Sequence, residues 1–169
     1  MVSAMNHDDY ADAYIRSVLD GVRTIAVVGA SPDWTRPSSY VMKYLASKGF
    51  VLCAINPKAA ANGQLINGDA AYASLADAPG PIDMVDIFRN SEAAGGIVDE
   101  ALALDPLPKA IWMQFHVRND AAAARAEDRG VKVVMNRCTK VEYSRLNGEL
   151  GWTGINPRVL TSKRRKLMP

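Results

Sequence analysis

The sequence predicts an α/β fold built on a doubly wound, parallel, five-stranded sheet with helices on both faces. Apolar, strand-like runs alternate with helical segments along the chain, which is the order that a parallel sheet with helical crossovers requires. Most of these runs are apolar at successive positions, as strands covered on both faces must be. The predicted strands are Thr24–Gly29, Phe50–Ile55, Met84–Phe88, Ala110–Gln114 and Val131–Asn136.

Helical segments fill the intervals between these runs. They are predicted at Ser38–Ser47, Glu92–Leu104 and Asp120–Arg129. Ser91 and Asn119 stand at N-cap positions, and each is followed by an acidic residue that suits the positive end of a helix.

A further helix, about Asp8–Leu19, is predicted before the first strand because apolar residues recur on one of its faces. The residues of that face are Ala11, Tyr14, Ile15, Val18 and Leu19. Gly49 and Gly130 follow two of the other helices, where a left-handed residue commonly ends a helix.

Length and composition bound the class of protein. The 169 residues are 49% apolar and 22% charged, as in an ordinary globular domain. We expect a single domain over residues 1–169, with residues 1–22 as an N-terminal helical segment packed on it and residues 145–169 as a C-terminal extension. The basic cluster 163–166 in that extension is either a solvated tail or a contact for an acidic partner or a ligand phosphate.

Charge and cysteine usage exclude several kinds of partner. The net charge of +2 does not favour nucleic acid, and no run has the length and apolarity of a membrane span or a signal peptide. Cys53 and Cys138 lie far apart and show no metal-ligand spacing. We therefore expect a cytoplasmic protein without a metal, and leave a protein partner or a homo-oligomer open.

In doubly wound sheets ligands bind beyond the carboxyl ends of the strands. Gly29-Ala30-Ser31 follows the first strand, and Arg36-Pro37-Ser38 begins the next helix. A helix N-terminus with an arginine beside it suits an anion such as phosphate. Ser31 and Trp34 stand where the later glycines of a dinucleotide site belong, so the loop is either a different phosphate site or a connection without a ligand.

The second and third strand ends add basic and aromatic groups. Asn56-Pro57-Lys58 places a cation where an NAD site has an acidic residue, which favours a ribose that carries a phosphate. After the third strand, Phe88 either flanks a base or packs in the core. Arg89 either meets a phosphate or forms an ion pair with Asp86 or Glu92.

The fourth and fifth strand ends carry Gln114 and His116, and then Asn136-Arg137-Cys138. Gln114 can both donate and accept hydrogen bonds at a ligand. No carboxylate or serine is visibly paired with His116, so a general-base role is not expected. Arg137 and Lys140 are cations of the kind that lower the pKa of a nearby thiol such as that of Cys138, but a cysteine at this position more often simply packs, which is the interpretation we favour.

These strand ends, taken in order, resemble the small bacterial CoA-binding-domain proteins, whose fold is also that of the CoA-binding domain of the succinyl-CoA synthetase alpha subunit. The resemblance covers about residues 10–162. It is carried by residues 27–32 with 36–38, by 55–58, by 83–89, by 111–114 and by 134–138.

The resemblance implies a Rossmann-like domain that binds coenzyme A. Gly29, Ala30, Ser31, Arg36 and Ser38 would hold the pyrophosphate, Lys58 would lie near the phosphorylated ribose, Phe88 and Arg89 would line the nucleotide, and Gln114 would line the inner part of the cleft. Pro37, Asn56, Pro57, His116, Asn136, Arg137 and Cys138 complete the candidate site. The family usually has glycine where this chain has His116, so an imidazole here would narrow the cleft or contact the ligand. The domain that carries a phosphorylated histidine in the synthetase is not expected here, and neither is its ligase chemistry.

The leading functional hypothesis is therefore a non-catalytic module that binds CoA or an acyl-CoA, since no residue constellation indicates an enzyme. Three alternatives remain: an NADP-dependent reductase, a thiol-exchange protein that uses Cys138, and an interaction protein without a ligand.

Overall fold

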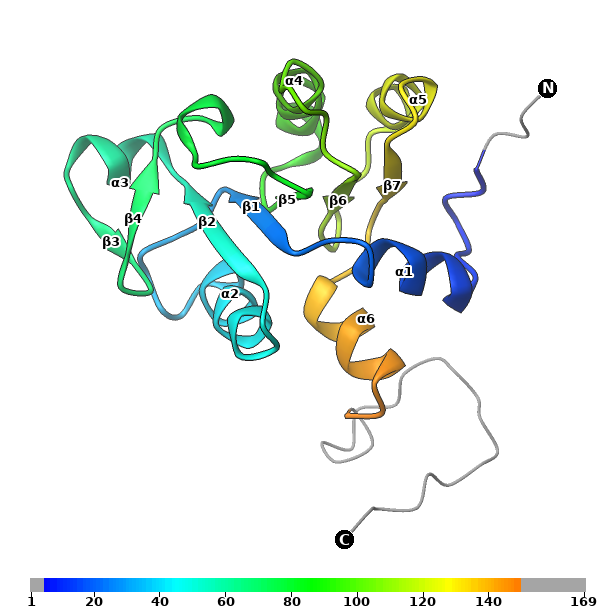
Figure 1. The fold of residues 1–169 in the computed structure, drawn as a ribbon, viewed down its shortest axis with the longest axis horizontal. Helices are drawn as coiled ribbons and strands as arrows, with labels where there is room; N and C mark the ends of the chain where they lie inside the picture. The colour runs from blue at the N-terminus through cyan, green and yellow to red at the C-terminus, as the bar shows by residue number, and fades with distance from the viewer. Residues whose placement is uncertain (1–4, 150–169) are drawn as a thin grey trace, which may run out of the picture.

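A computed structural model describes residues 5–149, so the expectations for the tail, including the basic cluster 163–166, lie outside the described residues. Its centre is a seven-stranded sheet in the order β3-β4-β2-β1-β5-β6-β7 (Figure 1). All neighbouring strands are parallel except β3 and β4. The strands are β1 Thr24–Val28, β2 Val51–Ile55, β3 Leu65–Ile66, β4 Asp69–Tyr72, β5 Met84–Ile87, β6 Ala110–Met113 and β7 Lys132–Val134.

The expectation of five strands is wrong, because the sequence pattern missed β3 and β4. They form an antiparallel hairpin around Asn67 and Gly68, whose φ angles are 52° and 90°. An Asn-Gly pair with positive φ at both residues is the turn that favours a two-residue hairpin. The pattern missed both strands because they are short: β3 is the edge strand, and β4, which has no fully buried residue, pairs with β2 over two residue pairs only.

The helices confirm the predicted alternation and add two that were not predicted, α3 and α6. They are α1 Asp12–Leu19, α2 Pro37–Ser47, α3 Pro57–Ala61, α4 Ser91–Leu102, α5 Asp120–Asp128 and α6 Thr139–Leu146, with a 3-10 turn at Leu75–Asp77. Asn119 caps α5 as expected. The N-cap of α4 is Asn90, not Ser91, because the Asn90 carboxamide accepts the Ala93 N–H at 2.8 Å and Ser91 is already helical.

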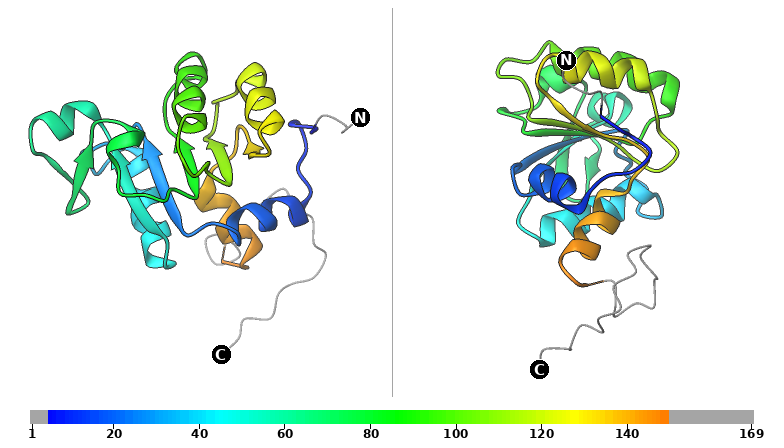
Figure 2. Two further views of the ribbon diagram at one scale, coloured as in Figure 1. Left: turned by 45° about the horizontal axis from the view of Figure 1, so that its top comes forward. Right: turned by 90° about the vertical axis from the view of Figure 1, so that its right-hand side faces the viewer.

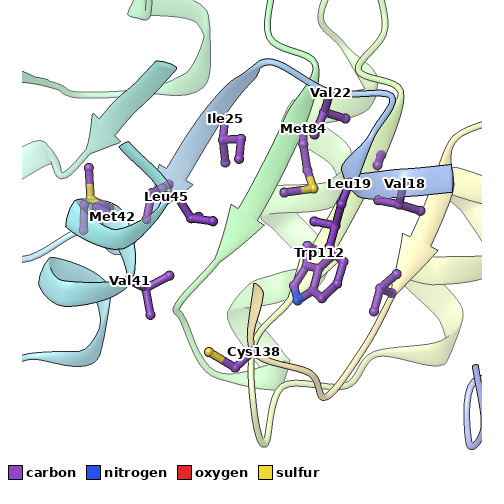
Figure 3. Packing of buried hydrophobic residues seen from close by; sticks show 14 of the residues in the cluster. Val18, Leu19, Val22, Ile25, Val41, Met42, Leu45, Met84, Trp112 and Cys138 are labelled. Atoms are coloured by element: carbon purple, nitrogen blue, oxygen red, sulfur yellow. The ribbon is translucent and has the colours of Figure 1, made fainter. Parts of the chain in front are cut away.

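Two layers of helices enclose the sheet. Helices α1, α2 and α6 lie on one face and α4 and α5 on the other (Figures 1 and 2). Each face has its own apolar core, and Trp112 is fully buried between β6 and the α1–α2–α6 layer (Figure 3). Because strand residues alternate between faces, Met84 belongs to this core whereas Val85 and Ile87 belong to the other.

The N-terminal segment covers the outer edge of β7. The Tyr14 hydroxyl donates to the Val133 carbonyl at 3.0 Å and accepts the Val133 N–H at 3.1 Å. The Tyr10 hydroxyl accepts the Met135 N–H at 2.8 Å, and its ring stacks on that of Tyr14. The predicted face of α1 is confirmed for Tyr14 and the three aliphatic residues after it, whereas Ala11 is exposed. These tyrosines satisfy backbone groups that an edge strand otherwise leaves free.

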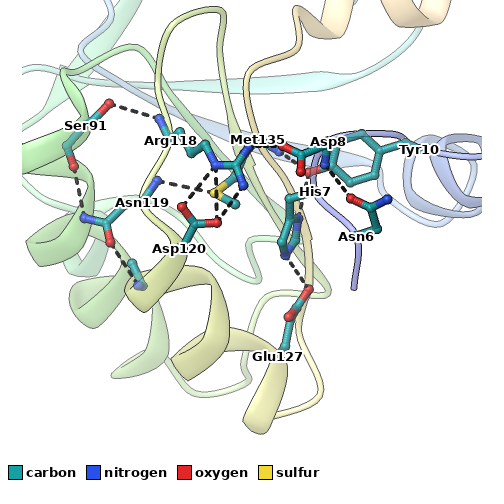
Figure 4. Close-up of polar contacts among 11 residues, drawn as sticks. Asn6, His7, Asp8, Tyr10, Ser91, Arg118, Asn119, Asp120, Glu127 and Met135 are labelled. Carbon is teal, nitrogen blue, oxygen red and sulfur yellow. Dashed lines mark hydrogen bonds and ion pairs between the residues drawn. The ribbon is translucent and has the colours of Figure 1, made fainter. Parts of the chain in front are cut away.

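His7 and Arg118 fasten the same segment to α5 and to the loop before it (Figure 4). His7 contacts Glu127 at 3.1 Å and the Tyr10 hydroxyl at 2.7 Å. Arg118 pairs with Asp8 and with Asp120. Of the helices within residues 5–149, none has the length and apolarity to cross a membrane.

Candidate functional site

The candidate site lies where the direction of the chain across the sheet reverses. From β1 the chain passes through α2 to β2 on one side, and β5 then starts the other half of the sheet on the opposite side of β1. Helix α2 follows β1 on one face and α4 follows β5 on the other (Figure 1). The carboxyl ends of β1 and β5 therefore form the topological switch point, which is where open α/β sheets bind ligands.

Gly29 allows the β1 and β5 ends to meet at this point. Its φ is 86°, and a Cβ placed on it would lie 3.2 Å from the carbonyl carbon and oxygen of Phe88. The Gly29 N–H donates to the Ile55 carbonyl at 3.1 Å, and the Phe88 N–H donates to the Val28 carbonyl at 2.8 Å. Glycine is thus required both by the backbone conformation and by the close approach of the neighbouring strand.

The loop from Gly29 to α2 is held in place by its own serines. The Ser31 N–H donates to Ser38 Oγ at 3.1 Å, and Ser38 is 3% exposed. Ala30, between Gly29 and Ser31, is buried. The Ser38 hydroxyl therefore shapes the loop, a role that the sequence did not reveal, while Ser31 remains partly accessible.

The N-terminus of α2 has a composition that suits an anion. Helix α2 begins at Pro37 after the N-cap residue Arg36, which makes no side-chain capping bond, and its first turn holds no acidic residue. The Arg36 guanidinium is largely exposed and lies 3.9 Å from the Asp33 carboxylate. Hydrogen bonds from Thr35 hold the pKa of that carboxyl below its usual value. The free N–H groups and helix dipole at this end favour negative charge.

Asn56 links the β2 end to the β1 loop. Its amide nitrogen donates to the Ala30 carbonyl at 2.8 Å, and its carbonyl oxygen accepts the Ala59 N–H at 3.0 Å. Asn56 thus caps α3, with Pro57 as the first helical residue. Lys58 follows in an exposed position, and no carboxylate within residues 5–149 forms a salt bridge with it.

A closed polar network lies just behind the switch point. The Gln114 amide nitrogen donates to the two carboxylate oxygens of Asp86 at 2.8 and 3.0 Å and to Thr139 Oγ1 at 2.9 Å. The Thr139 hydroxyl donates to the same carboxylate at 3.1 Å. Burial raises the pKa of Asp86 to about 7, although both donors act to lower it. The sequence analysis did not predict this network. The signal that could have revealed it is Asp86 itself, a single acidic residue within an apolar strand.

The network changes two expectations. The alternative of an ion pair between Arg89 and Asp86 is wrong. Asp86 is fully buried and bonded to Gln114 and Thr139, whereas Arg89 is exposed at the surface. The donor capacity of Gln114 is not available to a ligand, since its amide nitrogen is committed to Asp86 and Thr139. Phe88 is half-buried against the α2-side core, next to Gly29.

His116 and Asn136 form a strained pair at the β6 and β7 ends. Their φ angles are 67° and 55°, in the left-handed region that favours glycine. The His116 N–H donates to Asn136 Oδ1 at 2.8 Å, and the Ser91 hydroxyl donates to the His116 carbonyl at 3.3 Å. The His116 ring is exposed beside Phe115. The left-handed conformation explains why a glycine fits this position.

Arg137 and Cys138 do not form the reactive centre that was considered. The Arg137 guanidinium lies 5.3 Å from the centre of the Tyr10 ring and contacts the Asp8 carbonyl, so it joins the N-terminal segment. Cys138 is 9% exposed at the N-cap of α6, within the α2-side core. Burial raises the pKa of its thiol and outweighs the opposite effect of Lys140, so the packed cysteine that the sequence favoured is what the structure has. Cys53 is buried in β2 as expected.

Comparison with known proteins agrees with this architecture. A family model described as "CoA binding domain" matches residues 23–144. The uncharacterized protein YneT of Bacillus subtilis (strain 168) is 33% identical over 132 residues, which is 78% of this chain and 93% of that protein. Over most of its length the chain therefore belongs to the CoA binding domain family.

Solved structures show the same fold. A Thermus thermophilus protein is 36% identical with a TM-score of 0.74, covering 81% of this chain and 99% of that one. A hypothetical protein from Pyrococcus horikoshii OT3 is 33% identical with a TM-score of 0.76, covering 88% of this chain and 100% of that one. The family indicates CoA-related binding, and these relatives add no specific ligand.

Proposed function

We propose that this protein binds coenzyme A or an acyl-CoA at the carboxyl edge of the sheet, as a non-catalytic binding or regulatory module. The observation that carries the proposal is the uncapped N-terminus of α2 beside Gly29, at the switch point of a CoA-binding-domain fold. A pyrophosphate there would meet the free backbone N–H groups at the start of α2.

The cations around this edge fit CoA better than NAD. Arg36 and Arg89 are exposed next to the pyrophosphate position, and Lys58 is exposed at the first turn of α3. CoA carries a pyrophosphate and a ribose phosphate, whereas an NAD site places an acidic residue near Lys58 to bind ribose hydroxyls. Phe88 offers an apolar surface for the nucleotide.

The chemistry of the site supports binding more than catalysis. Burial makes the Cys138 thiol less acidic, which disfavours a thiolate nucleophile. The Asp86 carboxylate, just behind the carboxyl edge, is fully buried and hydrogen-bonded by Gln114 and Thr139, so it does not reach a ligand. Within residues 5–149, the His116 ring has no carboxylate partner to orient it as a base.

Calorimetric titration with CoA, acetyl-CoA, NADP and NAD tests the proposal. We expect CoA and acetyl-CoA to bind, and Arg36→Ala and Lys58→Ala to weaken each of them by about tenfold, as the loss of one charge-assisted phosphate contact does. Lys43→Ala is the matched control, because Lys43 is an exposed cation farther along α2. Preference for NADP, or equal effects of all three variants, would contradict the proposed site.

A further inference from the structure

Asp86 is a charged group in the interior that CoA binding as proposed does not use. It lies on β5 with no exposed surface, and its carboxylate accepts hydrogen bonds only from Gln114, just after β6, and Thr139 of α6 among the described residues. A buried ionised carboxylate is costly unless donors surround it. Its presence at the switch point therefore calls for a role that an apolar residue would not fill.

The network fixes which way round the Gln114 carboxamide points. Both carboxylate oxygens of Asp86 lie within 3.0 Å of the same Gln114 atom, and an ionised carboxylate, the form present at pH 8, accepts hydrogen bonds but does not donate them. That atom is therefore the amide nitrogen. The Thr139 hydroxyl donates its one proton to Asp86 and accepts the second amide proton of Gln114.

The carbonyl oxygen of Gln114 is left over. Gln114 is 5% exposed, and within residues 5–149 its Oε1 takes part in no hydrogen bond. No described side-chain oxygen or nitrogen is both sealed from solvent and unpaired, so Oε1 still reaches the surface. A nearly buried side chain thus presents one unpaired acceptor at the carboxyl edge of β6.

We propose that Asp86 is a positioning residue that locks the Gln114 carboxamide with its oxygen toward the ligand, where it accepts a hydrogen bond from an amide N–H of the pantetheine arm of CoA. This inference rests on the proposed function. The adenosine and phosphate half of CoA would depend on the α2 end and Lys58, whereas the pantetheine half would depend on this acceptor.

Asp86→Asn removes the lock with little change in size. One carboxylate oxygen becomes an NH₂ group, so the Gln114 amide faces a donor in one orientation and an acceptor in the other, and neither is enforced. Gln114→Met removes the acceptor itself. Asp128→Asn is the control, since Asp128 is an exposed carboxylate on α5.

Calorimetry at pH 8 compares CoA with adenosine 3′,5′-bisphosphate, which lacks the pantetheine arm. We expect Gln114→Met to weaken CoA by about tenfold, as the loss of one hydrogen bond does, and Asp86→Asn to weaken it by at least threefold. Binding of the bisphosphate should not change. In the Gln114→Met background, Asp86→Asn should have no further effect on CoA, because Asp86 acts through Gln114.

Equal weakening of CoA and the bisphosphate by Asp86→Asn would overturn the inference, because it indicates a general structural effect. CoA affinity unchanged by Asp86→Asn, or a full effect of Asp86→Asn in the Gln114→Met background, would also overturn it. Failure of the wild-type protein to bind CoA is a separate result that contradicts the proposed function and removes the ligand assigned to this acceptor.

The lock itself is measured without ligand. The Gln114 side-chain NH₂ protons should exchange slowly with solvent in the wild-type protein and fast in Asp86→Asn, as followed by NMR. Fast exchange in the wild-type protein would show that the carboxamide is not held, and would overturn the inference whatever binds.

Discussion

Single residues in strained or close-packed positions gather at the carboxyl edge of the sheet. Gly29 and His116 both have φ angles near +70 to +90°, at 86° and 67°. At Gly29 the residue type matches the conformation, whereas at His116 a side chain occupies a conformation that costs about 1 kcal/mol or more without glycine. A strained residue that persists next to a candidate binding edge is more consistent with a role in binding than with a role in stability.

His116→Gly should therefore raise the free energy of unfolding by about 1 kcal/mol, because the left-handed strain is removed. Urea denaturation measures this change. His116→Ala is the matched control, since alanine keeps the strain and should give no gain. A glycine variant less stable than the wild-type protein would show that the His116 side chain makes contacts worth more than the strain.

At the scale of elements, the N-terminal segment and α1 complete the sheet at β7. The Tyr10 and Tyr14 hydroxyls take the N–H groups of Met135 and Val133, the outward-facing donors of an edge strand. Burial raises the pKa of both tyrosines, to about 12 for Tyr14, so both stay neutral and able to donate. The segment thus replaces the missing neighbour strand with side-chain hydroxyls.

Tyr10→Phe should destabilise the protein by roughly 1–3 kcal/mol, because the Met135 N–H loses its acceptor in a buried setting. Chemical denaturation is the measurement, with Tyr40→Phe as control, since the Tyr40 side chain is exposed and donates no hydrogen bond within residues 5–149. A loss no larger than that of the control would mean that water replaces the hydroxyl at this edge.

The elements also show how far the sequence can predict this fold. The five central strands were predictable because helices cover both of their faces and leave continuous apolar runs such as Thr24–Val28. β4 was not predictable in this way. It is short, it pairs with β2 over only two residue pairs and none of its residues is fully buried, so it produces no apolar run. α6 was missed because its buried face includes Thr139, Glu142 and Ser144, which do not produce apolar periodicity.

The candidate site was predictable in position more than in detail. The strand-end rule predicts that Gly29, Ser31 and Asn56 lie near one another, and the structure has all three at the carboxyl edge of the sheet, because parallel strands end at one edge. It could not show that the side chains of Ser38 and Asn56 form hydrogen bonds to the backbone of the neighbouring loops. Nor could it pair Asp86 with Gln114 and Thr139, which are 28 and 53 residues away and meet only through the sheet and α6.

At the scale of the whole molecule, the buried Asp86 couples stability to pH. Its pKa of about 7 lies above the ordinary value near 4, because burial disfavours the charged form. Between these pH values the folded protein holds a proton that the unfolded chain releases. The contribution of this group to stability is therefore fully present below about pH 4 and is lost as the pH rises through about 7.

The wild-type protein should accordingly lose stability relative to Asp86→Asn as the pH rises from 5 to 8, as measured by the difference between their free energies of unfolding. The slope is about 1.4 kcal/mol for each pH unit within the window. Urea denaturation at several pH values measures it, and taking the difference cancels the other titrating groups. A difference that does not vary with pH would mean that Asp86 has an ordinary pKa in the folded protein.

The two apolar cores, one on each face of the sheet, leave the carboxyl edge as the place where loops from both halves converge (Figures 1 and 2). At the opposite edge, Gly21 and Lys132 line a depression of about 300 Å³ near the amino ends of the strands. Figure 3 shows apolar side chains of the core on the α2 side of the sheet. The uncapped helix N-terminus and the exposed cations lie at the carboxyl edge, so the proposed ligand belongs there.

Mapping the backbone N–H chemical shifts of the wild-type protein by NMR during titration with CoA tests this claim most directly. We expect the largest shifts at Gly29, Ser31 and Ser38, with further shifts near Gln114, while Gly21 and Lys132 at the opposite edge stay unchanged. Shifts concentrated at Gly21 and Lys132, or no shifts at all with saturating CoA, would contradict a CoA site at the switch point.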